Sequence, residues 1–415
     1  MDQGLFAASN FTLTVLLARW LTIEDYGAFT VAYAVFWFFG SFHTALLSEP
    51  MTVYGPGKFR DRLSVYMGIL LYGSFGYGIL SSLILLMLSL YFKLSGDSKV
   101  LSSALLGLAL AAPFILFQWL MRRACYVYLK PQFAALAGAM YMAMTLVGIY
   151  VLNLVDGLSP TAAFGLMGFT SLATGSWLAM RLRVGRPSLK AEKLSREAIS
   201  THWEYGRWSA PTTALGTVSE SSYYLLLPIW GGLAASAVFR ALMNLVLPVL
   251  HAITALSMFL LPNLVQARGS NEFKRLMRLG LLLFLLGSGL YWIMLGVFHY
   301  PLVSWLYGGR YIEYANLLWL VGLIPLARAV LSVFGEAIRA LERPDRVFLA
   351  QVLCAAVVLT AGLGLMVVWE AVGAILAYLA AQATMAAALV WLWISRDKQE
   401  STGSPGIEEG GRDRS

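Results

Sequence analysis

Residues 279–298 read LGLLLFLLGSGLYWIMLGVF, an uncharged stretch between Arg278 and His299. A helix of roughly 20 residues crosses the hydrocarbon core of a bilayer, which is about 30 Å thick. This stretch therefore has the length and composition of one membrane-spanning helix. Polar and apolar side chains do not alternate along it, so the pattern favours a helix over a strand of a β-barrel.

Eleven further apolar runs lie on either side of it, each bounded by charges, Pro, Gly or Asn. The chain of 415 residues is 59% AVILMFWYC and only 13% DEKR, whereas soluble domains contain roughly 25% charged residues. This composition excludes a soluble globular protein, a disordered chain and a coiled coil. It predicts an all-α membrane protein with about twelve transmembrane helices, at residues 4–20, 27–48, 65–92, 101–121, 133–153, 161–180, 208–229, 237–262, 279–298, 315–338, 347–368 and 372–393.

Lysine and arginine gather in alternate connections. One set of loops, together with the C-terminal tail, holds 24 of the 30 basic residues, and the opposite set holds only Lys93, Lys99 and Arg310. Because basic residues near span ends resist translocation, this asymmetry predicts that both termini are cytoplasmic. The net charge of +8 is expected to face anionic membrane lipids rather than nucleic acid, since the basic residues flank apolar runs.

The longest basic loop, at about residues 181–207, follows six spans and precedes six more. Two six-helix bundles around a central cavity is a common transporter plan. A weak repeat also relates the halves, because His43, Pro50 and Lys58 have counterparts in His251, Pro262 and Arg268. We therefore expect an N-terminal bundle at 1–182, a basic cytoplasmic linker at 183–206, a C-terminal bundle at 207–394 and a disordered cytoplasmic tail at 395–415.

Three arginines, Arg19, Arg240 and Arg328, fall inside predicted spans. A charge at the centre of a membrane helix costs at least roughly 2.5 to 3.5 kcal/mol, so such residues mark ion pairs or aqueous cavities. A guanidinium suits phosphate oxygens and stays charged at physiological pH. Arg328, more than one turn inside its span, is the strongest candidate for binding an anionic headgroup. The alternatives are an ion pair with Glu336 or Glu220 and, for Arg19, an anchor at the membrane surface.

Five residues are candidate proton carriers. Glu220 lies in an unusually polar span rich in Ser, Thr and Tyr, which is expected to line a hydrated path and to bind substrate or a proton. Interhelical hydrogen bonding explains the same hydroxyl groups equally well. Glu336 has a simpler explanation in a helical pair with Arg339. The remaining candidates for proton coupling are Glu49, which capping or loop pairing also explains, and His43 and His251, which packing also explains.

Three segments resemble a known family: DQGLFAASNF at 2–11, FRALMNL at 239–245 and IRALERPD at 338–345. In this order they are similar to bacterial polysaccharide-export flippases of the multidrug/oligosaccharidyl-lipid/polysaccharide (MOP) superfamily. The resemblance implies a cavity that opens to alternate sides of the inner membrane. It also implies outward movement of an undecaprenyl-diphosphate-linked oligosaccharide for polysaccharide biosynthesis, with a glycan polymerase and glycosyltransferases as candidate partners.

Motifs for catalysis are absent from the sequence. It contains no phosphate-binding Gly-rich loop followed by Lys, no metalloprotease motif and no nucleophile elbow. Cys125 and Cys354 provide neither a disulfide framework nor metal-ligand spacing. We therefore expect a secondary transporter that is not an enzyme and uses no cofactor or metal. The alternatives are a cation-coupled multidrug exporter of the same superfamily and a non-transporting scaffold of a glycan-assembly complex.

Overall fold

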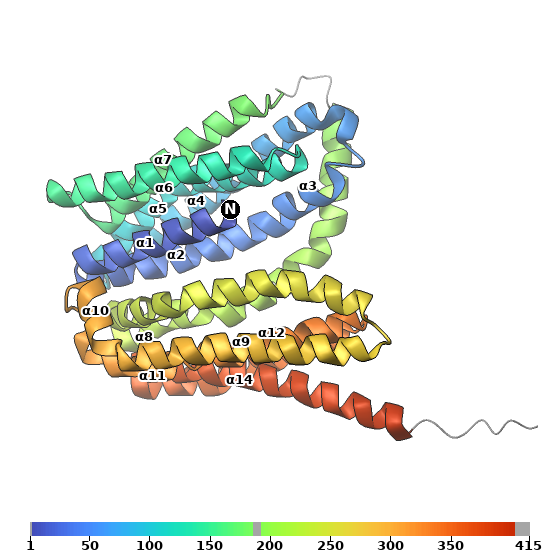
Figure 1. Cartoon of the computed structure of the whole chain (residues 1–415). Coiled ribbons are helices and arrows are strands. Elements are labelled where there is room, and N and C mark those ends of the chain that lie inside the picture. The colour runs from blue at the N-terminus through green and yellow to red at the C-terminus, as the bar shows by residue number, and fades with distance from the viewer. Residues whose placement is uncertain (1, 186–191, 403–415) are drawn as a thin grey trace, which may run out of the picture.

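The computed structural model describes residues 2–185 and 192–402, and every regular element in these ranges is helical (Figure 1). The N-terminal half contains α1 (Asp2–Trp20), α2 (Ile23–His43), η1 (Thr44–Ser48), α3 (Glu49–Tyr54), η2 (Arg60–Arg62), α4 (Leu63–Ser95), α5 (Lys99–Val127), α6 (Pro131–Leu154) and α7 (Pro160–Arg181). The C-terminal half contains α8 (Glu192–Gln266), α9 (Asn271–Val297), α10 (His299–Tyr307), η4 (Ile312–Leu317), α11 (Leu318–Val321), α12 (Ile324–Ala340), α13 (Pro344–Val357), η5 (Val358–Gly362) and α14 (Leu363–Thr402).

Local sequence sets many of the helix ends. Thr22, Ser98 and Ser159 each precede a helix, and each side chain accepts a hydrogen bond from the backbone N–H three residues later. Such N-caps satisfy amides that have no partner within the helix. Gly96 follows α4 with a φ of 77°, a left-handed conformation in which glycine carries no steric penalty.

Eight described helical stretches are long and apolar enough to cross a membrane. Two of them, Thr213–Gln266 and Asp345–Ser395, each turn back sharply, at Gly232 with a φ of 67° and at Glu370 with a φ of 46°. Each of these two stretches therefore supplies two crossings. Together with α1 and α7, which have 19 and 22 residues, the described chain contains twelve segments of crossing length. The prediction of an all-α membrane fold is confirmed.

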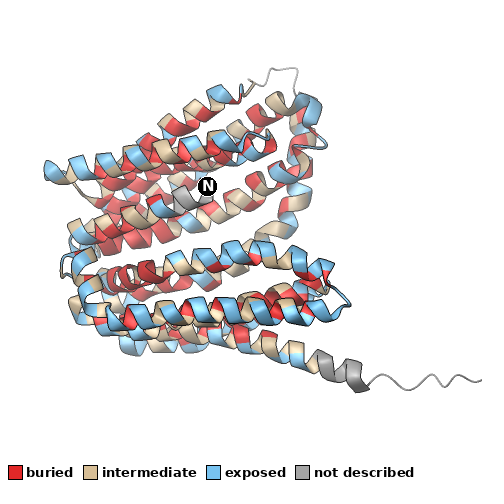
Figure 2. Cartoon of the chain, in the orientation of Figure 1, coloured by how far each residue is buried: buried red, intermediate tan, exposed pale blue. Residues whose placement is uncertain are grey.

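The chain folds as two lobes that lie side by side in Figure 1, an N-lobe of α1–α7 and a C-lobe of α8–α14. Buried residues line the faces where helices meet, and exposed residues cover the outer faces (Figure 2). Many of the exposed residues are large and apolar, including Leu282, Leu286 and Leu290 on α9. An apolar exterior of this kind is what a multi-pass membrane protein presents to lipid.

The two lobes meet tightly at one end of the molecule, which we call the closed end. Gly27 of α2 lies against Leu233 of α8 so closely that a Cβ on the glycine would be 2.0 Å from the Leu233 carbonyl oxygen. Nearby, the Asn244 side-chain amide donates to the Tyr26 hydroxyl at 3.0 Å. Both contacts join α2 of the N-lobe to α8 of the C-lobe, the first through close backbone approach and the second through side chains.

The opposite end carries most of the basic loops, and we call it the basic end. Here the amino-terminal part of α8, residues 192–209, packs against the N-lobe, whereas α8 belongs to the C-lobe from Tyr223 onward, where the tyrosine hydroxyl reaches Ala377 O. We call residues 192–209 the strap. Pro211 and Gly216 lie between these two parts of α8, and both residue types weaken a helix.

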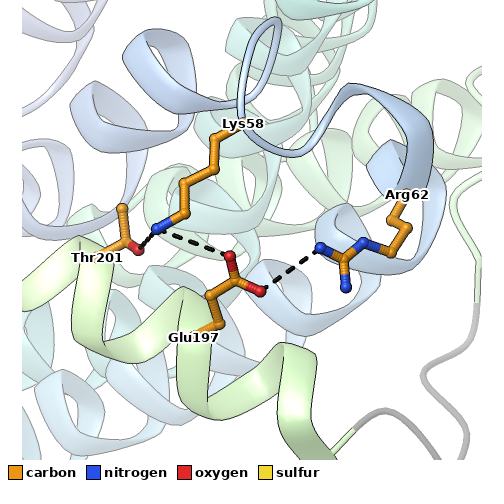
Figure 3. A network of polar contacts seen from close by, with 4 residues as sticks. All are labelled: Lys58, Arg62, Glu197 and Thr201. Atoms are coloured by element: carbon orange, nitrogen blue, oxygen red, sulfur yellow. Dashed lines mark hydrogen bonds and ion pairs between the residues drawn. The ribbon is translucent and has the colours of Figure 1, made fainter.

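Charged side chains fasten the strap to the N-lobe (Figure 3). Lys58 Nζ donates to the Thr201 hydroxyl at 2.7 Å and lies 3.7 Å from Glu197 Oε1. Arg62 reaches the other oxygen of Glu197 at 3.5 Å. These groups are one-third to one-half exposed, so solvent weakens the attraction between them.

A buried contact of the strap has a cause in the sequence of α2 and α3. Proline at position 50 has no N–H, and it follows the π-helical turn η1, so the regular α-helical backbone bonding is interrupted around Leu46. His202 of the strap lies there instead, with Nδ1 2.9 Å from Leu46 O. A carbonyl only accepts, so Nδ1 carries the proton, and Nε2 accepts from the Tyr66 hydroxyl at 2.7 Å.

The helices run beyond the apolar stretches of the sequence. α8 begins at Glu192, within the segment expected to be a linker, and α14 continues to Thr402, past the expected start of the tail at 395. Helix formers such as Arg396, Lys398 and Glu400 explain the second extension. The rest of the expected linker and tail, residues 186–191 and 403–415, lies outside the described residues.

Candidate functional site

A polar pocket lies inside the C-lobe, with a cavity volume of about 160 Å³. Glu220 of α8 and Arg328 of α12 both line it, together with Gln351 of α13 and Gln382 of α14. The fold therefore brings together two of the predicted site residues from spans that are separated by more than one hundred residues of sequence.

Helical spacing explains why α12 contributes a basic face to the pocket. Arg328, Leu331 and Arg339 all line the cavity, and positions i, i+3 and i+11 fall on one side of an α-helix. The rise of a helix puts the two arginines about 16 Å apart along the axis. α12 therefore presents positive charge from within the lobe out to the basic end.

Among the residues that the structure describes, Arg339 has an anionic partner and Arg328 has none. Arg339 donates to Glu336 Oε1 at 2.9 Å, so the expected pair between these residues is present. Among the described residues, no carboxylate lies within 4.0 Å of Arg328 and no cation lies within 4.0 Å of Glu220. The ion pair that the sequence allowed between Arg328 and Glu336 or Glu220 is therefore absent.

Gln382 adds unsatisfied hydrogen-bonding capacity to the pocket wall. Its side chain is 6% exposed, and its Oε1 has no hydrogen-bond partner in the described part of the chain. Neither Gln382 nor Gln351 was singled out from the sequence. Each is the only amide side chain in its apolar run, at 372–393 and 347–368, and that isolation is a signal that could have identified both.

Arg240 lies in a different place, at the closed end, where the lobes meet. Its guanidinium stands over the Tyr224 ring, 5.5 Å from the centroid, and within electrostatic reach of the Tyr26 and Tyr33 hydroxyls of α2. Aromatic faces attract such a cation without neutralising it. Arg240 is partly exposed and keeps a positive charge between the two lobes.

Arg19 is exposed and also lies at the closed end. It donates to the backbone carbonyl of Trp305 in the C-lobe at 3.1 Å. A reciprocal bond runs from Arg310 of the C-lobe to the backbone carbonyl of Leu21 in the N-lobe. Each lobe therefore contributes one arginine that donates a hydrogen bond to a backbone carbonyl of the other lobe. Sequence reasoning missed this role of Arg310, which looked like a loop residue.

The remaining predicted residues do not join the pocket. His43 is fully buried in the N-lobe. Its Nε2 lies 2.9 Å from Ser74 Oγ, and its Nδ1 has no partner among the residues described. Glu49 accepts a hydrogen bond of 2.6 Å from Ser209 of α8. His251 is exposed on α8. In the described ranges, His, Cys, Asp and Glu side chains form no group of three that could hold a metal ion.

No protein-family model and no curated protein sequence matches this chain. Solved structures do resemble it over nearly its whole length. An inward-facing multidrug resistance MATE family transporter of the MOP superfamily superposes with a TM-score of 0.79 at 14% identity, covering 96% of each chain. The lipid II flippase MurJ, in an inward closed conformation, superposes with a TM-score of 0.71 at 13% identity, covering 95% of this chain and 86% of that chain.

A third neighbour bears on the arrangement of the lobes. An outward-facing MATE family transporter of the same superfamily superposes with a TM-score of 0.63 at 12% identity, covering 96% of this chain and 94% of that chain. The TM-score is therefore lower with this outward-facing structure than with the inward-facing one. At these identities the likeness establishes the fold, which is that of MOP superfamily transporters. These three neighbours are two transporters and one flippase.

Proposed function

We propose that this protein is an inner-membrane flippase that moves an undecaprenyl-diphosphate-linked oligosaccharide outward for polysaccharide biosynthesis. The observation that carries the proposal is Arg328, a guanidinium in a polar pocket of a membrane lobe, which has no carboxylate partner within the ranges 2–185 and 192–402. Such a charge is costly in a membrane unless water or an anion compensates it. A diphosphate headgroup provides that anion, and a guanidinium fork matches its oxygens.

The charge distribution supports a direction of movement. Basic loops mark the cytoplasmic side of membrane proteins, so the basic end and both termini face the cytoplasm. The closed end then faces outward, in keeping with the likeness to an inward-facing transporter. The headgroup enters from the cytoplasm while the prenyl chain stays in lipid. The arginines inside the spans, Arg328, Arg240 and Arg19, neutralise the phosphates along the way.

Alternating access completes the transfer. Contacts at the closed end separate as the lobes rock, and the basic end closes behind the headgroup. Proton uptake by Glu220, Glu336, Glu49, His43 or His251 provides one source of energy, and consumption of the glycan by a polymerase or by glycosyltransferases provides another. Anionic lipids face the basic loops throughout.

The test is export in a reconstituted system. Purified protein is placed in vesicles that carry a labelled undecaprenyl-diphosphate glycan, and the label that crosses the bilayer is measured. Arg328→Ala should abolish transfer while the protein still inserts in the membrane, and Arg328→Lys should keep part of it. Arg60→Ala, which neutralises an exposed loop arginine, is the matched control and should transfer normally. Transfer by Arg328→Ala at the wild-type rate would reject the assignment.

A multidrug exporter is the second candidate, and the TM-score of 0.79 with a multidrug resistance transporter favours it. An exporter of cationic drugs needs an acidic site, and Glu220 is an exposed carboxylate on the wall of the C-lobe pocket. Drug susceptibility of a deletion strain separates the two. Hypersensitivity restored by the wild type but not by Glu220→Gln supports drug export, and unchanged susceptibility supports the flippase.

A further inference from the structure

Two tryptophans form a partly exposed aromatic surface on the N-lobe, which we call the tryptophan platform. Trp37 of α2 is 40% exposed, and Trp119 of α5 is partly exposed. Their ring centroids lie 5.1 Å apart with the planes tilted by 50°. The Tyr33 ring contacts Trp37 edge-on, with the centroids 6.1 Å apart. These neighbouring rings hold Trp37 in place while leaving part of its surface accessible to another molecule.

The platform faces the C-lobe rather than lipid. Tyr33 and Ser41 lie four residues before and four residues after Trp37, so all three share one face of α2. Arg240 of the C-lobe lies within electrostatic reach of the Tyr33 hydroxyl. The Thr217 hydroxyl of α8 donates to Ser41 Oγ at 3.0 Å. Trp37 therefore lies between two points at which α2 meets α8.

An arginine lies beside the platform, on the side of the basic end. Arg123 follows Trp119 by four residues on α5, which puts it on the same face and about 6 Å further along the helix axis. Arg123 is exposed, and no carboxylate of the described ranges lies within 4.0 Å of it. Glu49 is within electrostatic reach of its guanidinium. Arg123 is thus available to an anion that enters from the basic end.

These groups match the chemistry of a sugar that is joined to a phosphate. A pyranose ring has a face of C–H groups with a slight positive charge, which packs against the electron-rich face of an indole. Ser41 and Thr217 add hydroxyl groups for the polar edge of the sugar. The guanidinium of Arg123 binds phosphate oxygens and repels cations. A cationic drug therefore fits this surface less well than a sugar phosphate.

We infer that the tryptophan platform stacks against the sugar next to the diphosphate of the lipid-linked glycan, while Arg123 binds that diphosphate. The inference rests on the proposed function and adds the orientation in which the headgroup enters. The sugar points toward the closed end, and the phosphates stay near the basic end. The spacing of about 6 Å between Trp119 and Arg123 along α5 leaves room for one sugar ring.

Two lipids separate the sugar contact from the phosphate contact. Purified full chain in nanodiscs is titrated with undecaprenyl-diphosphate-N-acetylglucosamine and with undecaprenyl diphosphate, which lacks the sugar. Trp37→Leu should weaken binding of the sugar-bearing lipid about tenfold, the size of one good aromatic contact. It should leave binding of the bare lipid unchanged. Arg123→Gln should weaken binding of both lipids several-fold, because both carry the diphosphate.

A matched control and a conservative variant accompany these two. Trp391→Leu removes an exposed tryptophan of α14 in the C-lobe and should leave both affinities unchanged. Trp37→Phe keeps a smaller aromatic face, so it should weaken the sugar-bearing lipid less than Trp37→Leu does. If Trp37→Leu does not fold, as judged by gel filtration, selective weakening in Trp37→Phe carries the test.

Three results would overturn the inference. One is a Trp37→Leu variant that binds both lipids as the wild type does, and another is a variant that weakens both equally. The third is Arg123→Gln that binds both lipids at wild-type strength.

Sugar stacking and glycan transfer can fail separately. Selective loss of the sugar-bearing lipid in Trp37→Leu, in a protein that transfers no lipid-linked glycan, supports the platform and rejects the proposed function. Normal transfer by the wild type, with equal effects of Trp37→Leu on the two lipids, supports the function and rejects the platform.

Discussion

The two ends of the molecule hold the lobes by different physical means. At the closed end, backbone meets backbone where Gly27 packs on Leu233, and arginines of each lobe bind carbonyls of the other. At the basic end, long side chains of the strap reach across solvent to the N-lobe. Close packing tolerates little displacement, whereas flexible ion pairs tolerate a good deal. The closed end should therefore act as a two-state contact and the basic end as an adjustable one.

The largest effect is expected at Gly27. In Gly27→Ala, the new Cβ would meet the Leu233 carbonyl at 2.0 Å, so the lobes must move apart. Overpacking of this kind costs typically 1–3 kcal/mol. Spin labels on the exposed residues Glu24 and Glu313, one on each lobe, should show a longer distance across the closed end. Gly76→Ala, where nothing lies within 4 Å, should leave it unchanged. An unaltered distance in Gly27→Ala would argue against close packing as the seal.

A smaller effect is expected from the reciprocal arginines. Arg19→Gln and Arg310→Gln each remove a charged hydrogen bond to a backbone carbonyl. Such bonds are worth about 1.5–3 kcal/mol, and exposure of Arg19 reduces this to about 1 kcal/mol. The same labels should report a partly separated closed end in each variant and a further separation in the double variant. No response in the double variant would show that the arginines do not hold the lobes.

The strap should respond to pH through His202, which lies before the crossing segment that begins at Thr213. Burial lowers the pKa of His202, and its hydrogen bond to Leu46 O opposes part of that shift. A detached His202 has the usual pKa of about 6.5 and binds a proton that the buried one resists. Attachment is therefore complete above pH 6.5 and weakens as the pH falls below that value.

Hydrogen exchange of residues 192–209 measures this attachment. In the wild type, protection should fall several-fold between pH 7 and pH 5, after correction for intrinsic exchange, in line with loss of about 1 kcal/mol. In the His202→Asn variant, the asparagine amide can still donate to Leu46 O but does not titrate. Hydrogen-exchange protection of the strap in this variant should therefore not change with pH. Wild-type protection that does not change between pH 7 and pH 5 would contradict the role of His202 in attachment of the strap.

The smallest effect is expected at Glu197. Glu197→Gln removes the partner of Lys58 and Arg62, which lie at 3.7 and 3.5 Å and are about half exposed. Exposed pairs contribute 0.2–1 kcal/mol and are screened by salt. Hydrogen-exchange protection of the strap should fall by less in this variant than it falls in the wild type at low pH. The difference in protection between Glu197→Gln and the wild type should vanish in 1 M salt. A deficit that persists in 1 M salt would indicate a packing role instead.

The sequence predicts the fold better than the site, for physical reasons. The length of an apolar run and the charges at its ends are properties of neighbouring residues in the sequence. The run at residues 279–298 and the eleven others therefore locate all twelve spans. The pocket depends on which faces of α8, α12, α13 and α14 meet, and no local pattern encodes that meeting. Glu220 and Arg328 were identified because a charge inside an apolar run is unusual. Gln382 was not, because a neutral amide stands out less.

Contacts between the ends of helices that are distant in the sequence also could not be predicted from it. Arg310 stands among loop residues, and nothing near it indicates that it reaches Leu21. His202 lies in a polar segment that seemed to be only a connection. Its partner, the Leu46 carbonyl, lies in the π-helical turn before Pro50, and no local pattern indicates that His202 packs against that turn.

The carbonyl of Leu46 and its histidine donor are 156 residues apart, which has a consequence for biogenesis. At 5–20 residues per second, a ribosome needs roughly 8–30 s to make the intervening chain. For that interval the first half of the nascent protein lacks the histidine that contacts this carbonyl. The strap can therefore attach to the N-lobe only after the second half begins to emerge.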